Sequence, residues 1–240
     1  MAANRKVDDS SPDSSPSWAA RPCRSAPAGS IIDLRQLLAE RFPQTFAPAD
    51  DRLATGLGKI DTAIGGGLPK NAITELSSPH PSAGSALLIH ALLHNAHRAG
   101  YFLALVDGRD SFDPQSAGNT QLRNLLWLRC TNAFKAVQAA DLLLRDGNFP
   151  LVVLDLVLNA PEELRKIPQT NWYRLQRLVE AAPVAFLVLT RASIISSAQL
   201  KLTLDNAWRL ADLEQEDLAP RLNIQVKRAQ GGRVVMAGAG

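Results

Sequence analysis

Cysteine is scarce in this sequence of 240 residues: its two cysteines, Cys23 and Cys130, lie far apart and lack the spacing of a metal site. This usage argues against a disulfide framework and fits a reducing cytoplasm. Long apolar runs are also missing, so we expect no segment to cross a bilayer. The first residues lack the apolar core of a secretory signal peptide. These absences predict a cytoplasmic protein without membrane association.

Charge of one sign is not in large excess either. The 26 Lys and Arg residues against 23 Asp and Glu residues leave a formal net charge of +3 at pH 7, which by itself is a weak indication of nucleic-acid binding. The sequence does contain enough apolar material for a core, with 46% hydrophobic and 20% charged residues. Its length leaves room for one substantial domain with tails.

Residues 1–29 are rich in Ser, Pro and Ala and show no periodicity, which predicts a disordered tail. Residues 30–50 are expected to hold a short helix and a linker, because Ser30 and Asp33 resemble a capping box and Pro43 ends the pattern. One face of this helix is apolar: Ile31, Leu34, Leu37 and Leu38. A helix this short is marginal alone, so it should dock either on its own domain or on a neighbouring subunit.

Residues 51–240 are predicted to form one α/β domain, because apolar strand-like runs alternate with segments of helical period. This alternation is typical of a mostly parallel sheet with helices on both faces. The expected strands are 73–76, 101–106, 125–130, 151–154 and 184–189. Helices are expected after the first of these strands, at 133–145 and at 162–182. The chain is expected to close with a β-hairpin that joins 221–228 to a return strand at 233–237 through Gly231 and Gly232.

The segment between the first strand and the following helix has the length and setting of a phosphate-binding P-loop but not its residues. A working P-loop has the pattern G-x-x-x-x-G-K-S/T, whose backbone N–H groups and lysine hold phosphates. Ser78, Ala83, Gly84 and Ser85 occupy the four defining positions, so both glycines and the lysine are replaced and only the hydroxyl remains. We therefore predict a degenerate nucleotide site without a resident cofactor, with weak ATP binding through Ser85 and the loop amides left open.

The residues before this loop contain TG, ID, GGGLP and ITEL between positions 55 and 76, and this pattern resembles RecA-type recombinases. The resemblance places Gly84 on the P-loop lysine and Ser85 on the magnesium-binding threonine. Asp155 resembles a Walker B aspartate, although a structural strand end is the simpler interpretation without the lysine. Arg109 stands where RecA proteins have the glutamate that polarises the attacking water. Arg191 or a near neighbour stands at the γ-phosphate-sensing glutamine. The resemblance thus implies a RecA-like fold, and the losses imply that the protein is not an ATPase.

The sequence resembles the RecA-derived ImuA group and its SulA-like relatives over about residues 50–237. The resemblance is carried by these losses, by the short interval after Asp155 and by an ending of the type L-x-I-x-V-x-K-R. Members of the ImuA group are accessory proteins of error-prone translesion synthesis, and they work with a Y-family-like polymerase subunit and with RecA. The resemblance implies a non-catalytic adaptor in the DNA damage (SOS) response with such partners, with self-association left open. Two alternatives remain: a SulA-like cell-division inhibitor and a divergent RecA-like ATPase or recombinase.

Basic residues toward the C-terminus are the candidates for contact with the DNA backbone: Arg191, Lys201, Arg221, Lys227, Arg228 and Arg233. Such contact would be independent of DNA sequence, and the alternative is a solvated strand face. A second cluster, His90, His94 and His97, lies on one face of the helix after the loop. No carboxylate accompanies these histidines, so we interpret them as a wet polar face and predict no metal site.

Overall fold

The computed structural model describes residues 51–80, 83–208 and 221–229. The chain divides into two units, 1–43 and 44–240, and every described residue belongs to the second unit. The predicted tail at 1–29 and the predicted helix and linker at 30–50 lie outside the described residues. The turn and the return strand of the predicted C-terminal hairpin lie outside them as well.

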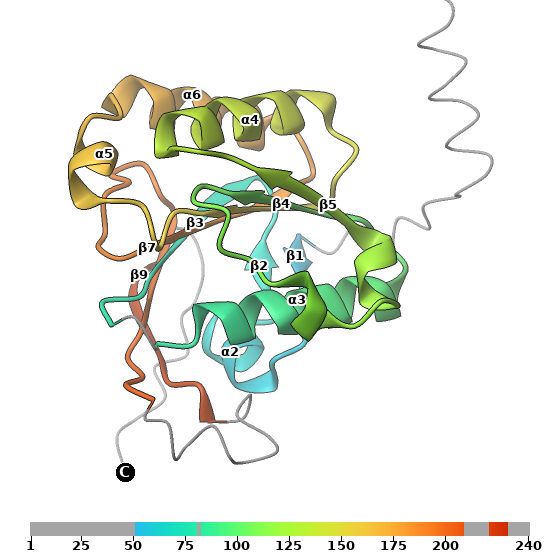
Figure 1. Cartoon of the computed structure of the whole chain (residues 1–240). Coiled ribbons are helices and arrows are strands. Elements are labelled where there is room, and N and C mark those ends of the chain that lie inside the picture. Colours follow the sequence, from blue (N-terminus) through green and yellow to red (C-terminus); the bar gives the residue numbers. More distant parts are fainter. Residues whose placement is uncertain (1–50, 81–82, 209–220, 230–240) are drawn as a thin grey trace, which may run out of the picture. The chain divides into compact units, whose positions relative to one another are not determined.

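A seven-stranded sheet in the order β5-β4-β6-β7-β3-β8-β9 forms the centre of the domain (Figure 1). Its strands are β3 (Ala72–Ser77), β4 (Leu103–Asp107), β5 (Leu125–Arg129), β6 (Leu151–Asp155), β7 (Ala185–Thr190), β8 (Leu200–Leu204) and β9 (Ile224–Ala229). The six strands from β3 to β8 run parallel, and β9 pairs antiparallel with β8. A separate antiparallel pair joins β1 (Arg52–Leu53) to β2 (Leu68–Pro69). The predicted α/β fold with a mostly parallel sheet is confirmed.

Helices cover both faces of this sheet, as Figure 1 shows: α4 and α6 lie on one face, and α2 and α3 lie on the other. The helices and 3-10 turns are α2 (Gly58–Ala63), α3 (Ser85–Ala99), η1 (Pro114–Ala117), η2 (Gln121–Asn124), α4 (Ala133–Asp146), α5 (Pro161–Arg165) and α6 (Gln169–Glu180). Within the described ranges, none of these helices is both long and apolar enough to cross a bilayer.

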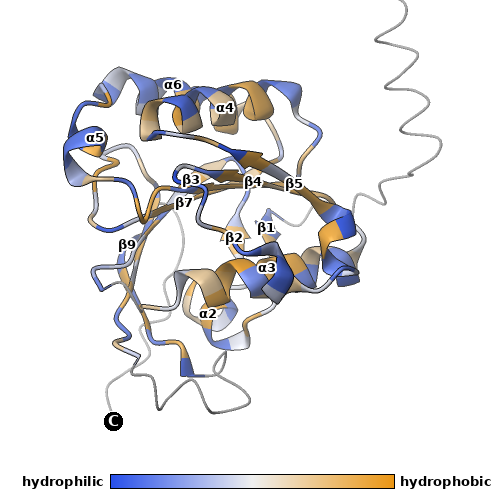
Figure 2. Cartoon of the chain, in the orientation of Figure 1, coloured by the Kyte–Doolittle hydropathy of each residue, from blue (hydrophilic) through white to orange (hydrophobic). Residues whose placement is uncertain are grey.

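Strand alternation divides the apolar residues between two cores, because successive side chains of a strand point to opposite faces. In β6, Val152 and Leu154 pack against the layer of α4 and α6, whereas Leu151 and Val153 pack against the layer of α2 and α3. All four side chains are fully buried, as expected for a parallel strand covered on both faces. Figure 2 shows that the central strands consist mostly of apolar residues, whereas apolar and polar residues alternate along the helices that cover them.

The structure differs from the sequence prediction at two places. The predicted helix at 162–182 is two helices, α5 and α6, because Pro168 stands at the N-cap of α6 and has no N–H group with which to continue a helix through this point. The strand β8 was missed, since its apolar residues alternate with Lys201 and Thr203. It is the antiparallel partner of β9. The strand that pairs with β9 therefore precedes β9 in the chain, whereas the sequence analysis predicted a partner after it, at 233–237.

Candidate functional site

The degenerate phosphate loop lies at the carboxyl edge of the parallel sheet, where open α/β sheets bind their ligands. It leaves β3 at Ser78, whose N–H donates to the carbonyl of Thr190 at the end of β7 (2.7 Å). Ser78 is fully buried. Ala83 is also fully buried, and its N–H donates to the carbonyl of His80 (3.2 Å). The loop is therefore part of the packed core at both ends, and α3 begins immediately after it at Ser85, which is partly exposed.

Gly84, the residue in the place of the P-loop lysine, has a backbone that suits glycine. Its φ of +102° is a conformation that residues with a side chain rarely adopt. A Cβ atom added here would lie 2.5 Å from Leu222 Cδ2 and 3.4 Å from Trp208 Nε1. A lysine at this position would therefore have no room to leave the backbone unless Leu222 moved. Leu222 is itself buried, at 3% exposure, and belongs to the core on this side of the sheet.

Leu222 and Trp208 belong to the connection between β8 and β9, and we call its described residues, 205–208 and 221–223, the cover segment. Its two ends are tied together by hydrogen bonds. The Asp205 N–H donates to the Asn223 carbonyl (3.1 Å), and the Asn223 N–H donates to Asn206 Oδ1 (2.8 Å). The Arg221 guanidinium lies 5.4 Å from the centre of the Trp208 ring. The cover segment is thus a bonded unit that packs over Gly84.

Three buried polar atoms cluster where β3 and β7 end beside the loop. They are Ser78 Oγ, Thr190 Oγ1 and Arg191 Nε, and none of them has a hydrogen-bond partner among the described residues. Buried polar groups without partners are costly, and these three are hydroxyl or guanidinium groups that can donate to an anion. Together with the N-terminus of α3 they could hold a weakly bound anion. They do not replace the lysine, whose position is filled by Leu222.

Asp155 and Asp107 end neighbouring strands at the same level of the sheet. The carboxylate of Asp107 organises its own loop, because it accepts the backbone N–H groups of Arg109 (3.1 Å), Ser111 (2.7 Å) and Phe112 (2.8 Å). Asp155 accepts one N–H, from Val157 (3.0 Å). Burial raises the pKa of Asp155 to about 6, the Val157 N–H opposes this rise, and the charge of Asp107 adds to it. The two aspartates at this edge of the sheet thus have different surroundings: Asp107 is saturated by the N–H groups of its own loop, whereas Asp155 is buried with a single N–H donor.

Arg109, in the place of the catalytic glutamate, lies toward α5. Its guanidinium is 3.6 Å from Glu163 Oε1, and its side chain is about half exposed. The loop that carries it is fixed by Gly108, whose N–H donates to the Asp155 carbonyl (2.9 Å) and whose carbonyl accepts from Asn159 Nδ2 (3.0 Å). Asn159 Nδ2 also donates to Glu163 Oε2 (3.0 Å). The arginine thus belongs to a network between this loop and α5.

Glu75, in the middle of β3, is a charged residue that the sequence analysis did not single out. It is 1% exposed. Its carboxylate accepts the N–H groups of Ile194 (2.6 Å) and Ile195 (2.9 Å) and the hydroxyl of Ser193 (2.7 Å). It also forms an ion pair with Lys201 (3.0 Å). The signal in the sequence was a lone acid inside an apolar strand, which demands a buried partner. The charge of Lys201 is therefore neutralised by Glu75 and its side chain is only 18% exposed, so the prediction that Lys201 contacts DNA is not supported.

Three of the remaining basic candidates lie on β9 or just before it, at the edge of the sheet. Arg221, Lys227 and Arg228 are exposed. Lys227 donates to Gln225 Oε1 (2.7 Å), and Arg228 donates to the Ser196 carbonyl (3.4 Å). Arg233 lies outside the described residues. The structure therefore spreads these three candidates along the edge of the sheet, with Arg221 before β9 and Lys227 and Arg228 near its far end, and it places Arg191 directly after β7 beside the phosphate loop.

The three histidines of α3 each contact the connection between β4 and β5. His90 lies 3.0 Å from Ser116 Oγ, His94 lies 3.4 Å from Gln121 Nε2, and His97 lies 3.1 Å from Asn124 Oδ1; each distance is from a ring nitrogen. Burial lowers the pKa of His90, and Asp113 opposes this shift. Within the described part of the chain, no three His, Cys, Asp or Glu residues gather as metal ligands would. The histidines fasten α3 to this connection.

A parallel sheet with a phosphate-type loop between β3 and α3 and an aspartate at the end of β6 defines an α/β fold of the P-loop NTPase type. Residues 44–164, just over half of the chain, match the family of the RecA N-terminal domain, and the chain belongs to that family. The RecA protein of Frankia alni is 34% identical over 120 residues, which are 49% of this chain and 34% of that protein. The RecA protein of Clavibacter michiganensis is 36% identical over 121 residues, which are 49% of this chain and 32% of that protein. The chain thus spans about a third of the length of these curated relatives.

Proposed function

We propose that this protein is a non-catalytic RecA-like adaptor of the cytoplasmic DNA damage response. The observation that carries the proposal is Gly84, which stands in the place of the P-loop lysine with a φ of +102° and with Leu222 where a side chain would be. Phosphoryl transfer depends on charge neutralisation around the γ-phosphate, and the P-loop lysine with magnesium supplies much of it. Here the cover segment fills the lysine's place with apolar atoms.

Two further positions support the loss of ATP chemistry. Arg109 cannot accept a proton from the attacking water in place of a glutamate, because a guanidinium stays protonated at any physiological pH. It is also engaged with Glu163. By the resemblance to RecA proteins, Arg191 or a near neighbour stands at the γ-phosphate-sensing glutamine. Three positions of a working ATPase are thus replaced independently, while the sheet and its two cores are intact.

The cellular role we propose is support of error-prone translesion synthesis in the manner of the ImuA group. The support for this step is the resemblance of the sequence to that group, together with membership of the RecA family. A domain that keeps its core but not its chemistry acts through its surfaces, so we propose that it binds a translesion polymerase subunit, RecA, or both. Contact with DNA phosphates through the exposed edge at β9 would add affinity without sequence preference.

A steady-state phosphate-release assay on the purified full chain tests the loss of catalysis. We expect no ATP turnover above background, with or without single-stranded DNA, from the wild type and from Gly84→Lys. Ser85→Ala is the matched control, since a hydroxyl that serves no catalytic magnesium can be removed without effect. Turnover that Ser85→Ala abolishes would refute the proposal and support the divergent ATPase.

Affinity capture of the full chain from cells with damaged DNA tests the adaptor role. We expect recovery of a polymerase subunit or RecA, and more of it after damage than before. Recovery of a cell-division protein without either of these would favour the SulA-like inhibitor instead. The position of the gene beside a polymerase gene under damage control would separate the same two hypotheses.

A further inference from the structure

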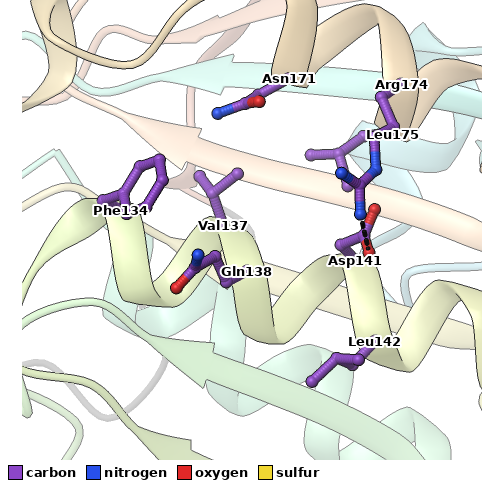
Figure 3. Close-up of a pocket in the computed structure, with 8 residues that line it drawn as sticks. All are labelled: Phe134, Val137, Gln138, Asp141, Leu142, Asn171, Arg174 and Leu175. Atoms are coloured by element: carbon purple, nitrogen blue, oxygen red, sulfur yellow. Dashed lines mark hydrogen bonds and ion pairs between the residues drawn. The ribbon is translucent and has the colours of Figure 1, made fainter.

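A groove of about 380 Å³ lies between α4 and α6 on the outer surface of the domain (Figure 3). One face of α4 lines one side of it, with residues 134, 137, 138, 141 and 142 at helical spacing. From α6 come Asn171, Arg174 and Leu175. The lining stretch of α4 covers eight residue steps, which is about 12 Å or two helical turns. The groove thus has the length that one face of a short helix would contact.

The apolar residues of the groove divide into a buried floor and two exposed anchors. Val137 and Leu175 are 3% and 1% exposed and form the floor. Phe134 and Leu142 are 47% and 68% exposed and lie at opposite ends of the α4 face. Single exposed apolar residues are ordinary on a protein surface. Two of them at i and i+8 on one helix, bordering one groove, are the arrangement that a helical partner with an apolar stripe would cover.

The charged residues in and beside the groove carry a small net positive charge. Asp141 is the one acid among the described residues that line it, and its Oδ2 accepts from both Arg145 Nε (2.9 Å) and Arg174 (2.6 Å). Both arginine side chains are more than half exposed, at 51% and 58%. Arg145 does not line the groove, but it shares the Asp141 carboxylate with Arg174, so this cluster beside the groove has one carboxylate and two guanidiniums and a net charge of about +1. A ligand that carries a carboxylate would complement this site.

We propose that the groove between α4 and α6 binds an amphipathic helix of a partner protein, with its apolar stripe over Phe134 and Leu142 and an acidic side chain toward Arg174 and Arg145. The proposal rests on the proposed adaptor function and names the chemistry of the partner segment. Apolar contact supplies most of the affinity, and the arginines select acidic over basic helices.

Two synthetic peptides test the proposal against the full chain. Both are 14-residue, fluorescein-labelled helices with leucines at i, i+3 and i+7, and they differ only in flanking glutamates or flanking lysines. By fluorescence anisotropy at low salt we expect the glutamate peptide to bind at least roughly tenfold more tightly than the lysine peptide. Equal affinities, or no binding of either peptide, would overturn the proposal.

Three variants locate the binding. Phe134→Ala and Leu142→Ala should each lower the affinity for the glutamate peptide by about tenfold, because each removes an apolar side chain that anchors the peptide. Arg174→Gln keeps a hydrogen-bond donor for Asp141 but removes the positive charge, so the affinities of the two peptides should come within about threefold of each other. Leu158→Ala is the control, because Leu158 is 53% exposed and does not line the groove. Unchanged affinities in the first three variants would refute the groove as the site.

The same experiment separates the other occupants and the proposed function. A dimer of the full chain that Leu142→Ala dissociates would show that a second copy of this chain covers the groove, and would overturn a partner helix. The phosphate-release assay is independent of these titrations. If neither peptide binds and no ATP turnover is found, the groove proposal is refuted and the adaptor function stands. If ATP turnover is found and the glutamate peptide binds, the adaptor function is refuted and the groove proposal stands.

Discussion

Replacing Asp155 with asparagine should stabilise the fold at neutral and alkaline pH. The carboxyl lies at the end of β6 and accepts a single N–H, from Val157, which an asparagine Oδ1 can also accept. Burial raises its pKa from 3.8 to about 6, with Asp107 adding to the shift. The folded state therefore holds the proton more tightly than the unfolded chain does. This group's contribution to the free energy of unfolding is greatest below pH 3.8, falls as pH rises toward 6, and is constant above that.

The size of the effect follows from the shift. Each tenfold change in the proton equilibrium corresponds to ~1.4 kcal/mol, so ionisation of Asp155 costs the fold about 3 kcal/mol at most. The residue keeps some exposure to solvent, which screens part of this penalty. We expect Asp155→Asn to raise the free energy of unfolding by about 1–3 kcal/mol at pH 8, and by about half as much at pH 5.

Urea unfolding of both proteins between pH 5 and pH 8 measures this difference. Glu162→Gln is the matched control, since Glu162 is exposed in the first turn of α5 and should change stability little at any pH. We expect Asp155 to bind no metal, so magnesium should not raise the stability of the wild type. A metal bound by Asp155 would stabilise the folded state by mass action. A variant that is less stable at pH 8, a difference independent of pH, or stabilisation by magnesium would each refute the reasoning.

Three further predictions follow from the same structure. Gly84→Lys should lower the free energy of unfolding by about 2–3 kcal/mol in urea titrations, because it combines a strained φ with overpacking against Leu222. An unchanged unfolding midpoint would contradict the packing of the cover segment over Gly84. Glu75→Gln should cost about 3–5 kcal/mol by the same measurement, since it leaves a mostly buried lysine without its partner, and a loss under 1 kcal/mol would show that the ion pair is dispensable. Lys227→Ala with Arg228→Ala should weaken the binding of single-stranded DNA of any sequence and lower the salt slope of log K by roughly 1–2. Lys166→Ala is the control, because Lys166 is exposed at the end of α5, away from β9; wild-type protein without affinity for DNA at low salt would refute the prediction.

Much of the fold could be predicted because its signals are local. The buried strands of the parallel sheet are short apolar runs, and two of them end in the aspartates that mark the carboxyl edge, Asp107 and Asp155. The loop after β3 has recognisable length and setting. The break at Pro168 was missed because an apolar period continues on both sides of it, and β8 was missed because it is half-buried and carries Lys201.

The place of the loop residues in the fold could be predicted, but their surroundings could not. Gly84 and Ser85 were expected at the start of α3, and the structure places them there. The contact of Gly84 with Leu222 joins positions far apart in the chain, and it depends on how the connection after β8 folds back over the loop. No periodicity or spacing encodes such a contact.

The sequence by itself determined that the lysine is absent, that the sheet is mostly parallel and that its carboxyl edge holds the degenerate loop. These follow from residue identity and from the period of apolar side chains, which act over a few residues. Only the tertiary structure decided that Leu222 occupies the lysine's place, that Glu75 neutralises Lys201 and that α4 and α6 leave a positively charged groove. These depend on which distant segments pack together, and close packing fixes them only when the whole core is assembled.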